Sequence, residues 1–224
     1  MTVTDTLLVN ERFLSIQGES TYAGLPCLFI RLSGCNLRCG YCDAAYTWEE
    51  PGNIETVSQL MAWAARYPDT LIEITGGEPL LQENVYPLMQ GFIDNGRQVL
   101  LETNGSVPLS RVPDEVAIIM DIKSPDSGMH LSLDLGNLEL LRQRAHRQCP
   151  DEVKFVLCSP EDFHWAAGMV RRHKLSDHLP VLFSPVTQRI SPKTVAELLL
   201  DAQLPVRLQL QLHTLLWPEK QRGA

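Results

Sequence analysis

Short apolar segments alternate with amphipathic segments along almost the whole chain, and no other feature of the sequence limits its fold so strongly. Seven apolar segments predict strands: Leu28–Leu32, Thr70–Thr75, Gln98–Thr103, Val116–Ile122, Val153–Leu157, Val181–Phe183 and Val206–Leu210. Five segments between them have helical spacing: Ile54–Tyr67, Asn84–Asn95, Leu135–Arg147, Glu161–His173 and Pro192–Ala202. We expect buried parallel strands, in either a doubly wound sheet or a complete or partial barrel.

Four further segments add to this pattern. Val9–Ile16 predicts a strand or a hairpin edge before the alternation begins, and the Cys42–Asn53 connection has no regular pattern. Asn95-Gly96 is a helix stop signal and Ser191-Pro192 is a helix start signal. With 224 residues and 44% hydrophobic content, the chain is long enough to bury one core, so we expect a single domain over residues 1–224.

The charge balance argues against a partner rich in phosphate. The formal net charge is −8, from 19 Lys and Arg against 27 Asp and Glu, and no basic block interrupts the sequence. No apolar stretch approaches the roughly 18 residues that span a bilayer, and the first residues are polar. We therefore expect a cytoplasmic protein with a small-molecule substrate, without nucleic acid or membrane partners.

Polar or glycine-rich segments follow five of the predicted strands. They begin at Cys35, Thr75-Gly-Gly-Glu-Pro79, Glu102-Thr-Asn-Gly105, Asp121-Ile-Lys-Ser-Pro125 and Ser184-Pro-Val-Thr187. In doubly wound sheets and barrels alike, ligands bind at the C-terminal ends of the strands. The sequence therefore predicts that all five segments lie at one rim.

Three cysteines, Cys35, Cys39 and Cys42, crowd into eight residues directly after the first core strand. A disulfide framework suits small secreted chains, and a zinc site would need a fourth Cys or His, for which His130 and His146 are not convincingly placed. Buried free thiols are the other alternative. We favour a [4Fe–4S] cluster, which is normally held by four thiolates, so that three would leave one iron open.

The other cysteines, Cys27, Cys149 and Cys158, are not predicted ligands. Cys27 and Cys158 adjoin strand cores, where Cys behaves as a small apolar residue.

The segment Thr75-Gly76-Gly77-Glu78-Pro79 places two glycines at the end of a strand. Glycines allow a ligand to approach the backbone closely, and the carboxylate of Glu78 could pair with an ammonium group. Taken alone, this segment is equally well interpreted as a tight turn between a strand and a helix.

Together, the cysteines and this segment resemble the radical S-adenosylmethionine superfamily. In that superfamily a CxxxCxxC triplet leaves one iron of a [4Fe–4S] cluster for the amino and carboxylate groups of the cofactor. The resemblance implies that Gly76-Gly77-Glu78 meets the methionine amino group and that Tyr41 lies beside the adenine. It also implies reductive cleavage of the cofactor to a 5′-deoxyadenosyl radical.

A more specific resemblance runs almost from end to end. The segments that carry it are Phe13-Leu-Ser-Ile-Gln17-Gly18-Glu19-Ser20, Gly24-Leu-Pro26, Phe29-Ile-Arg31-Leu, the cysteines with Asp43 and Thr47-Trp48, Ile74-Thr75-Gly-Gly-Glu-Pro79, Glu102-Thr-Asn-Gly105, Asp121-Ile-Lys123 and Arg207-Leu-Gln-Leu-Gln-Leu-His213. They resemble the 7-carboxy-7-deazaguanine synthase family. That family converts 6-carboxy-5,6,7,8-tetrahydropterin to 7-carboxy-7-deazaguanine with loss of ammonia, on the route to queuosine and other 7-deazapurines.

The resemblance implies a partial (β6/α3) barrel, a homodimer and an electron donor such as flavodoxin or ferredoxin. It assigns substrate contacts to Ile16, Gln17, Gly18, Arg31 and Thr75. It assigns cofactor contacts to Tyr41, Cys42, Asp43, Gly77, Glu78, Asp121, Ile122, Lys123, Ser184, Pro185, Val186 and Thr187.

The chemistry of three of these residues agrees with the assigned roles. Arg31 can grip the pterin carboxylate with two parallel hydrogen bonds, although a surface salt bridge is the alternative. Gln17 can donate to and accept from the amide edge of a pterin, although a polar turn residue is the alternative. Lys123 could hold the cofactor carboxylate or ribose, and its alternative is a surface lysine that extends its head to water.

The sequence departs from the family at two positions. Members often have Cys-Asp-Thr after the cluster loop, where the threonine helps to bind Mg²⁺, but here the third residue is Ala44. A methyl group cannot ligate magnesium, so the ion is either absent, held by Asp43 or Thr47, or bound mostly by substrate and water. Near the C-terminus, Thr214 replaces the usual lysine, and the resemblance leaves open whether the terminal carboxylate of Ala224 enters the site.

Two rival functions remain. A glycyl-radical-enzyme activase shares the cysteines and the reduced barrel, but Gln17-Gly-Glu19 and Arg31 favour a small-molecule substrate. A non-catalytic electron-transfer protein would need neither an open iron nor Gly76-Gly77-Glu78.

Overall fold

The computed structural model describes residues 5–145, 150–220 and 222–223. Within these ranges, nine strands form a single sheet in the order β3-β1-β2-β4-β5-β6-β7-β8-β9. Their bounds are β1 Thr6–Ile16, β2 Pro26–Leu32, β3 Asn53–Thr56, β4 Leu71–Gly76, β5 Val99–Thr103, β6 Ala117–Lys123, β7 Glu152–Leu157, β8 Val181–Pro185 and β9 Arg207–Leu208. From β2 to β9 neighbouring strands are parallel, whereas β1 is antiparallel to β2 and β3.

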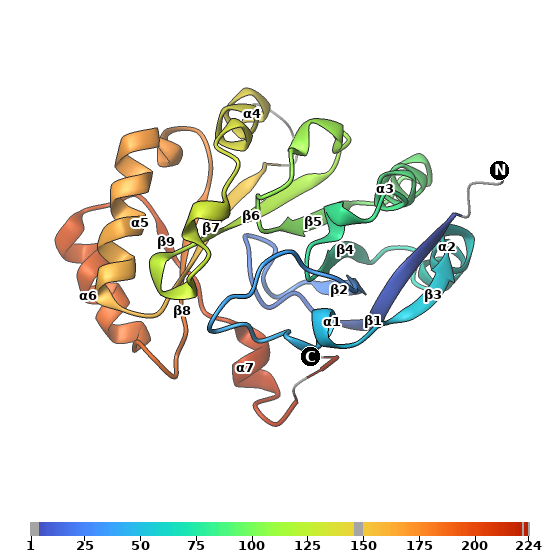
Figure 1. The fold of residues 1–224 in the computed structure, drawn as a ribbon, viewed down its shortest axis with the longest axis horizontal. Helices are drawn as coiled ribbons and strands as arrows, with labels where there is room; N and C mark the ends of the chain where they lie inside the picture. Colours follow the sequence, from blue (N-terminus) through green and yellow to red (C-terminus); the bar gives the residue numbers. More distant parts are fainter. Residues whose placement is uncertain (1–4, 146–149, 221, 224) are drawn as a thin grey trace.

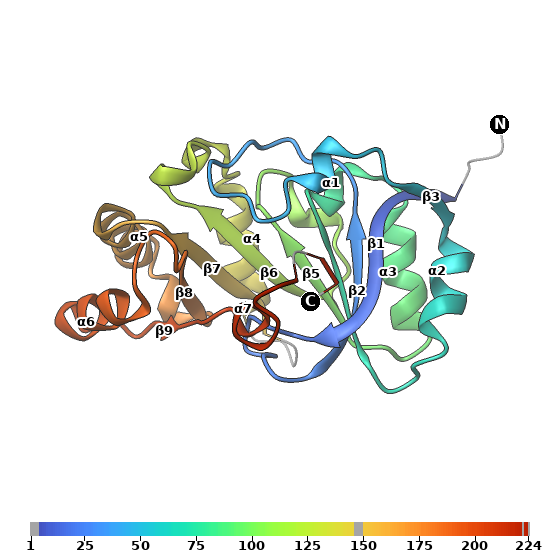
Figure 2. The same cartoon turned by 90° about the horizontal axis from the view of Figure 1, so that it is seen from below.

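The sheet is curved and open, with β3 and β9 as its two edges. The α-helices of the described ranges are α1 Tyr46–Glu49, α2 Val57–Ala64, α3 Val85–Asp94, α4 Gly136–Arg144, α5 Pro160–His173, α6 Pro192–Ala202 and α7 Leu212–Leu216. Figures 1 and 2 show α2 to α6 along the outer side of the curve and α7, with the end of the chain, on the inner side. The architecture is therefore a partial barrel, as predicted.

The two faces of the sheet differ in polarity. Successive side chains of a strand point to opposite faces, and in β4 Ile72 and Ile74 join the fully buried core beneath the helices. Burying each of these side chains contributes about 1.5–3 kcal/mol. Glu73 and Thr75 alternate with them and line the inner face. The outer face therefore holds the main core, while the inner face is left for polar groups.

The starts of three helices follow from their capping residues. Thr56 forms a reciprocal capping box with Gln59 at the start of α2, and the hydroxyls of Ser159 and Ser191 accept backbone N–H groups at the starts of α5 and α6. Each such cap contributes about 1 kcal/mol. The predicted start at Ser191-Pro192 is confirmed, and Gly96, with φ of 72°, follows the end of α3 as the stop signal predicted.

Several predicted boundaries are wrong. The predicted helix Ile54–Tyr67 begins only at Val57, because its first residues pair with β1 as strand β3. The predicted buried strand Val206–Leu210 shrinks to the exposed pair Arg207–Leu208 at the sheet edge.

Other segments differ less. The irregular Cys42–Asn53 connection contains the short helix α1. The strand predicted over Val9–Ile16 is confirmed as β1, which begins earlier, at Thr6, and lies between β2 and β3 in the sheet. The helix predicted over Leu135–Arg147 is observed as α4, and the last two residues of that prediction lie outside the described residues. Among the described helices, none has the length and apolar character needed to span a bilayer.

Candidate active site

A cavity of about 760 Å³ lies on the inner side of the sheet, at the C-terminal ends of the parallel strands. All five segments that were predicted to share a rim contribute to its wall. They supply Cys35; Thr75, Gly76 and Gly77; Glu102, Thr103 and Asn104; Asp121 and Lys123; and Val186 and Thr187. This prediction is confirmed.

The three cysteines of the triplet, Cys35, Cys39 and Cys42, all line this cavity as free thiols. Cys42 is exposed and the other two are half-buried, so their sulfur atoms lie at an accessible surface rather than in the core. Cys27 and Cys158 are buried free thiols away from the cavity wall, and Cys149 lies outside the described residues.

The donor set fits a [4Fe–4S] cluster. Within the described ranges, no three His, Cys, Asp or Glu side chains surround a point where a single metal ion could bind. A cubane cluster has a different requirement, because each thiolate binds a separate iron. Three free thiols on one loop, facing a common cavity, provide three of the four positions and leave the fourth to another ligand.

The glycines after β4 hold the cysteine loop against the sheet. The N–H of Gly77 donates to the carbonyl of Leu32 at 3.2 Å, and the N–H of Glu78 donates to the carbonyl of Gly34 at 2.8 Å. A Cβ added at Gly77 would lie 2.2 Å from that carbonyl oxygen and 2.6 Å from the Cβ of Cys35. Glycine is therefore required here for the close approach of two backbones, beside the first cysteine.

Glu78 is fully buried behind the cavity wall. Its carboxylate accepts hydrogen bonds from Thr103 Oγ1 at 2.9 Å, from the N–H of Asn104 at 2.8 Å and from the N–H of Leu80 at 3.1 Å. Burial raises the pKa of Glu78, although these hydrogen bonds oppose the shift. The carboxylate ties the ends of β4 and β5 together, and its predicted contact with an amino group stays a prediction.

Three other predicted cofactor contacts also lie outside the cavity wall. The side chain of Ile122 belongs to the core on the helix side of the sheet, so its backbone is what remains for a ligand. Ser184 and Pro185 are buried in β8, and the Ser184 hydroxyl has no hydrogen-bond partner among the described residues. Val186 and Thr187, which follow them, do line the cavity.

Tyr41, Asp121 and Lys123, for which cofactor contacts are predicted, line the cavity. The ammonium of Lys123 lies 2.8 Å from Asp121, and the hydroxyl of Tyr41 donates to the carbonyl of Val156 at 3.5 Å. Burial alone would lower the pKa of Lys123, but Asp121, together with Tyr41 and Cys39, more than offsets this and the pKa is raised. Lys123 is thus a half-buried cation of the cavity wall rather than a surface lysine.

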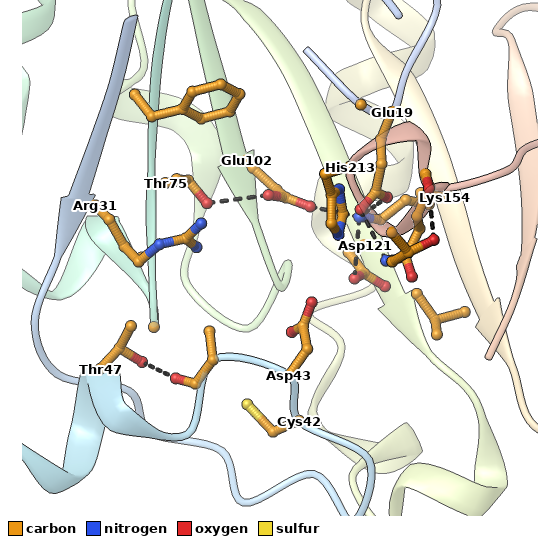
Figure 3. A pocket seen from close by; sticks show the side chains of 18 of the residues that line it. Glu19, Arg31, Cys42, Asp43, Thr47, Thr75, Glu102, Asp121, Lys154 and His213 are labelled. Carbon is orange, nitrogen blue, oxygen red and sulfur yellow. Dashed lines mark hydrogen bonds and ion pairs between the residues drawn. The ribbon is translucent and has the colours of Figure 1, made fainter. Parts of the chain in front are cut away.

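Arg31 projects from β2 into the cavity opposite the cysteine loop (Figure 3). Its Nε donates to Glu11 at 2.8 Å, and Glu11 also accepts from the hydroxyl of Tyr46 at 2.9 Å. The Nη1 and Nη2 groups make no hydrogen bond to the described residues. The salt bridge that was the alternative does exist, but it uses one edge of the guanidinium and leaves the other edge for a ligand.

The predicted substrate residues at the end of β1 also reach the cavity. Ile16, Gln17 and Gly18 line it, and Gln17 is only 4% exposed. The carbonyl of Gly18 accepts from the N–H of Leu212, and a Cβ at Gly18 would lie 2.8 Å from Nδ1 of His213. The segment that carries α7 therefore packs directly over the Gln17-Gly18 turn.

Comparison with known proteins places this chain in a family. The Radical SAM superfamily matches residues 29–157, which is more than half of the chain. The chain is 40% identical over 217 residues to the 7-carboxy-7-deazaguanine synthase of Chlorobaculum tepidum, with 97% of each chain covered. It is 38% identical over 230 residues to that of Koribacter versatilis, which covers 96% of this chain and 99% of the relative. This chain belongs to the 7-carboxy-7-deazaguanine synthase family.

Solved structures show the same fold. QueE from Escherichia coli superposes with a TM-score of 0.74 at 22% identity, over 92% of this chain and 94% of that chain. Streptococcus suis SuiB bound to S-adenosylmethionine superposes with a TM-score of 0.55 at 14% identity, over 79% of this chain and 47% of that chain. Membership of the radical SAM superfamily implies a [4Fe–4S] cluster and S-adenosylmethionine as cofactors.

The position that often carries threonine in this synthase family is Ala44, which is buried. Its carbonyl oxygen accepts a hydrogen bond from Thr47 Oγ1 at 2.8 Å, so the proton of the Thr47 hydroxyl is already directed at the cysteine loop. Asp43 is exposed, lines the cavity and makes no hydrogen bond to the described residues. Asp43 is therefore the accessible carboxylate that could bind a cation beside the cysteine loop.

The other departure from the synthase family lies in the segment that carries α7. Thr214 lines the cavity, and its hydroxyl donates to the carbonyl of Gln211 at 2.7 Å. His213, Trp217 and Arg222 also line the cavity, and Ala224 lies outside the described residues.

Sequence reasoning missed a charged network opposite Arg31. Lys154 on β7 lies 2.8 Å from Glu19, 2.5 Å from Glu102 and 3.6 Å from Asp121 (Figure 3). Burial would raise the pKa of Glu102, but Lys154, with smaller contributions from Lys123 and Thr75, outweighs it and the pKa is lowered to about 2. The signal was available, because Glu102 and Lys154 are charged residues inside otherwise apolar strands.

Proposed function

We propose that this protein converts 6-carboxy-5,6,7,8-tetrahydropterin to 7-carboxy-7-deazaguanine with loss of ammonia. The observation that carries the proposal is that one cavity joins the free cysteine triplet to the unused edge of Arg31. The names of the relatives that match almost the whole chain support the same reaction.

The residues divide the cavity into two regions. Cys35, Cys39 and Cys42 would hold the cluster, and Tyr41, Asp43, Gly77, Asp121, Lys123, Val186 and Thr187 would surround S-adenosylmethionine. When bound, these two cofactors supply a 5′-deoxyadenosyl radical that abstracts a hydrogen atom from the substrate. Ile16, Gln17, Gly18, Arg31 and Thr75 would bind the pterin on the opposite side.

Arg31 would orient the substrate. Two parallel N–H groups match the two oxygens of a carboxylate, and Glu11 holds the guanidinium at its other edge. The pterin ring would then extend toward Gln17 and Thr75. Thr75 Oγ1 already donates to Glu102 at 3.0 Å, so its oxygen is available as an acceptor.

The proposal carries further requirements. The reaction needs a one-electron donor, for which a flavodoxin or a ferredoxin is suitable, and the cluster needs thiols that stay reduced, as in the cytoplasm. The homodimer implied by the family, a single domain over the whole chain and the absence of a nucleic-acid partner stay predictions. No observation favours a glycyl-radical-enzyme activase or a non-catalytic electron carrier.

The test is an anaerobic assay of reconstituted protein with S-adenosylmethionine, a reductant and 6-carboxytetrahydropterin, following 7-carboxy-7-deazaguanine and 5′-deoxyadenosine by mass. We expect both products, and a Cys39→Ala variant should form neither. If 5′-deoxyadenosine appeared without the deazaguanine, the cofactor chemistry would stand and the substrate assignment would be wrong.

A further inference from the structure

Glu73 is a buried acid in the cavity wall to which the proposed function gives no role. It lies on β4, two residues before Thr75, so that strand alternation turns both side chains to the cavity. Glu73 is only 4% exposed. Among the described residues, no Lys, Arg or His lies within ion-pair distance of its carboxyl group.

The hydrogen-bond partner of Glu73 is Gln17. The Nε2 of Gln17 donates to Oε2 of Glu73, and the Oε1 of Gln17 accepts from the N–H of Glu19 at 3.0 Å. The backbone of Gln17 is held as well, because its N–H donates to Leu25 at 2.8 Å and its carbonyl accepts from Gly24 at 2.8 Å.

These contacts fix which way the Gln17 amide faces. An amide side chain has two N–H donors and two acceptor lone pairs. If the amide rotated by half a turn, Nε2 would face the N–H of Glu19. Two donors would then face each other, and the hydrogen bond from Glu19 to Oε1 of Gln17 would be lost. One N–H and one lone pair of Gln17 are left for a ligand in the cavity.

Glu73 can hold this arrangement without a cation. Burial raises its pKa well above the usual range, and the nearby carboxylates of Glu102 and Glu19 add to the shift. Lys154 pairs with both of those carboxylates, so the cluster already carries more negative than positive charge, and a neutral carboxylic acid at Glu73 is favoured over another carboxylate. A neutral carboxyl group still has a carbonyl oxygen that accepts from Gln17.

We propose that Glu73 is a positioning residue that orients the Gln17 amide, so that Nε2 presents its remaining N–H to an acceptor on the amide edge of the pterin. This inference rests on the proposed function. Glu73 acts through Gln17 and not on the reacting atoms. Its loss changes how tightly the pterin binds and leaves the cluster and cofactor region intact.

The test compares three variants of the reconstituted enzyme under anaerobic conditions. Glu73→Met keeps an unbranched side chain of similar size but removes the oxygen acceptor, and Glu73→Asp withdraws the carboxyl group by one methylene. Both should raise KM for 6-carboxytetrahydropterin about tenfold, since the N–H of Gln17 that faces Glu73 is then left buried without an acceptor. Glu73→Gln keeps a neutral acceptor at the same reach and should restore KM to within about threefold of wild type.

Two readouts separate positioning from a structural role. Formation of 5′-deoxyadenosine without substrate should stay within about twofold of wild type in all three variants, because the cofactor region is untouched. Adding Glu73→Met to Gln17→Met should raise KM no further than Gln17→Met alone, because the two residues act as one unit. If Glu73→Met fails to fold, Glu73→Asp carries the same comparison.

The outcomes are distinct. A wild-type enzyme without deazaguanine product would refute the proposed function and, with it, the substrate named for Gln17. An active wild type with an unchanged KM in Glu73→Met and Glu73→Asp would overturn the role of Glu73 alone. Additive effects in the double variant would show that Glu73 does not act through Gln17, and a Glu73→Gln variant as impaired as Glu73→Met would contradict the neutral acceptor.

Discussion

Arg31 divides its guanidinium between the protein and the cavity, and this division makes its role testable. Glu11 holds the Nε edge and the Nη groups remain free of partners among the described residues. We predict that Arg31→Ala raises KM for the pterin about 10- to 100-fold, since charge-assisted hydrogen bonds contribute about 1.5–3 kcal/mol. The measurement is steady-state kinetics with the pterin as the varied substrate, together with iron content.

Arg12 provides the matched control for that variant. It pairs with Glu55 at 3.1 Å, lies over the ring of Trp63 and does not line the cavity. Arg12→Ala should leave KM for the pterin unchanged. Equal effects of the two substitutions would remove Arg31 from the binding site, and a loss of iron in Arg31→Ala would point to a structural role.

Ala44 leads to a second prediction at the same scale. A hydroxyl-bearing residue is missing where the family often binds Mg²⁺, and the Thr47 hydroxyl donates to the loop. We predict that chelation of Mg²⁺ slows wild-type turnover by less than about threefold, while Ala44→Thr gains a clear dependence on added Mg²⁺, since this cation requires oxygen ligands. An absolute requirement in the wild type would show that Asp43, substrate and water suffice to hold the ion.

Individual residues were predictable where their chemistry is rare. Three cysteines in eight residues favour a metal centre over disulfides or buried thiols, and Arg31 stands four residues before the first of them. Glu73 and Lys154 could have been singled out, because a charge inside an apolar strand needs a partner. Those partners could not be named, since Glu19 is 135 positions from Lys154 in the sequence.

The turn after β4 shows how an element positions the site. Gly77 lies so close to Gly34 and Cys35 that a Cβ would force two backbones apart. We predict that Gly77→Ala loses at least half of the iron and sulfide bound by wild type after reconstitution, because the cysteine loop is displaced from the sheet. Chemical iron and sulfide determination and the visible absorption of the cluster provide the measurement.

Gly168 within α5 is the control for a glycine substitution in general. A Cβ there meets nothing within 4 Å, and alanine favours a helix interior over glycine by about 0.5–1 kcal/mol. Gly168→Ala should retain the full cluster content and unfold at a slightly higher temperature. A Gly77→Ala protein with wild-type cluster content would show that the loop tolerates a shift of the β4 turn.

The elements themselves were predictable to the extent that they are apolar. Strands β2 and β4 to β8 are buried on the helix side, and their Val, Ile, Leu and Phe residues were enough to predict them. Strand β3 is polar and exists because it pairs with β1, and β9 is two exposed residues at the edge of the sheet. Both depend on tertiary pairing, which leaves little trace in local composition.

For the molecule as a whole, the inner face of the sheet gathers charges from distant parts of the chain. Lys154 pairs with both Glu19 and Glu102, and Lys123 pairs with Asp121. Burial and the neighbouring carboxylates raise the pKa of Glu73 on this face, so it keeps its proton to a higher pH in the folded chain than in the unfolded chain. Such a group links the stability of the whole fold to pH, because the folded chain keeps a proton that the unfolded chain releases.

This linkage gives the last prediction. In the unfolded chain Glu73 ionises above about pH 4.5, whereas burial raises its pKa in the folded chain. Between these two pKa values the folded wild type binds more protons than the unfolded chain. Its free energy of unfolding therefore falls as the pH rises toward the folded pKa. The Glu73→Gln variant has no ionisable group at this position, so it lacks this part of the pH dependence. The stability gap in favour of the variant should grow by up to about 1.4 kcal/mol, or about 3–5 °C in Tm, for each pH unit.

The measurement is anaerobic thermal unfolding of the cluster-loaded wild type and Glu73→Gln between pH 5 and 8. Lys154 and Arg31 oppose the pKa shift of Glu73. The pKa of Glu102 is lowered to about 2, so Glu102 stays ionised in both proteins across this pH range. Its contribution therefore cancels in the difference between the two proteins. Glu197→Gln, on the exposed face of α6, should leave the gap constant. A constant gap for Glu73→Gln as well would mean that Glu73 is ionised in the folded protein, and the neutral acceptor inferred for Gln17 would then be wrong.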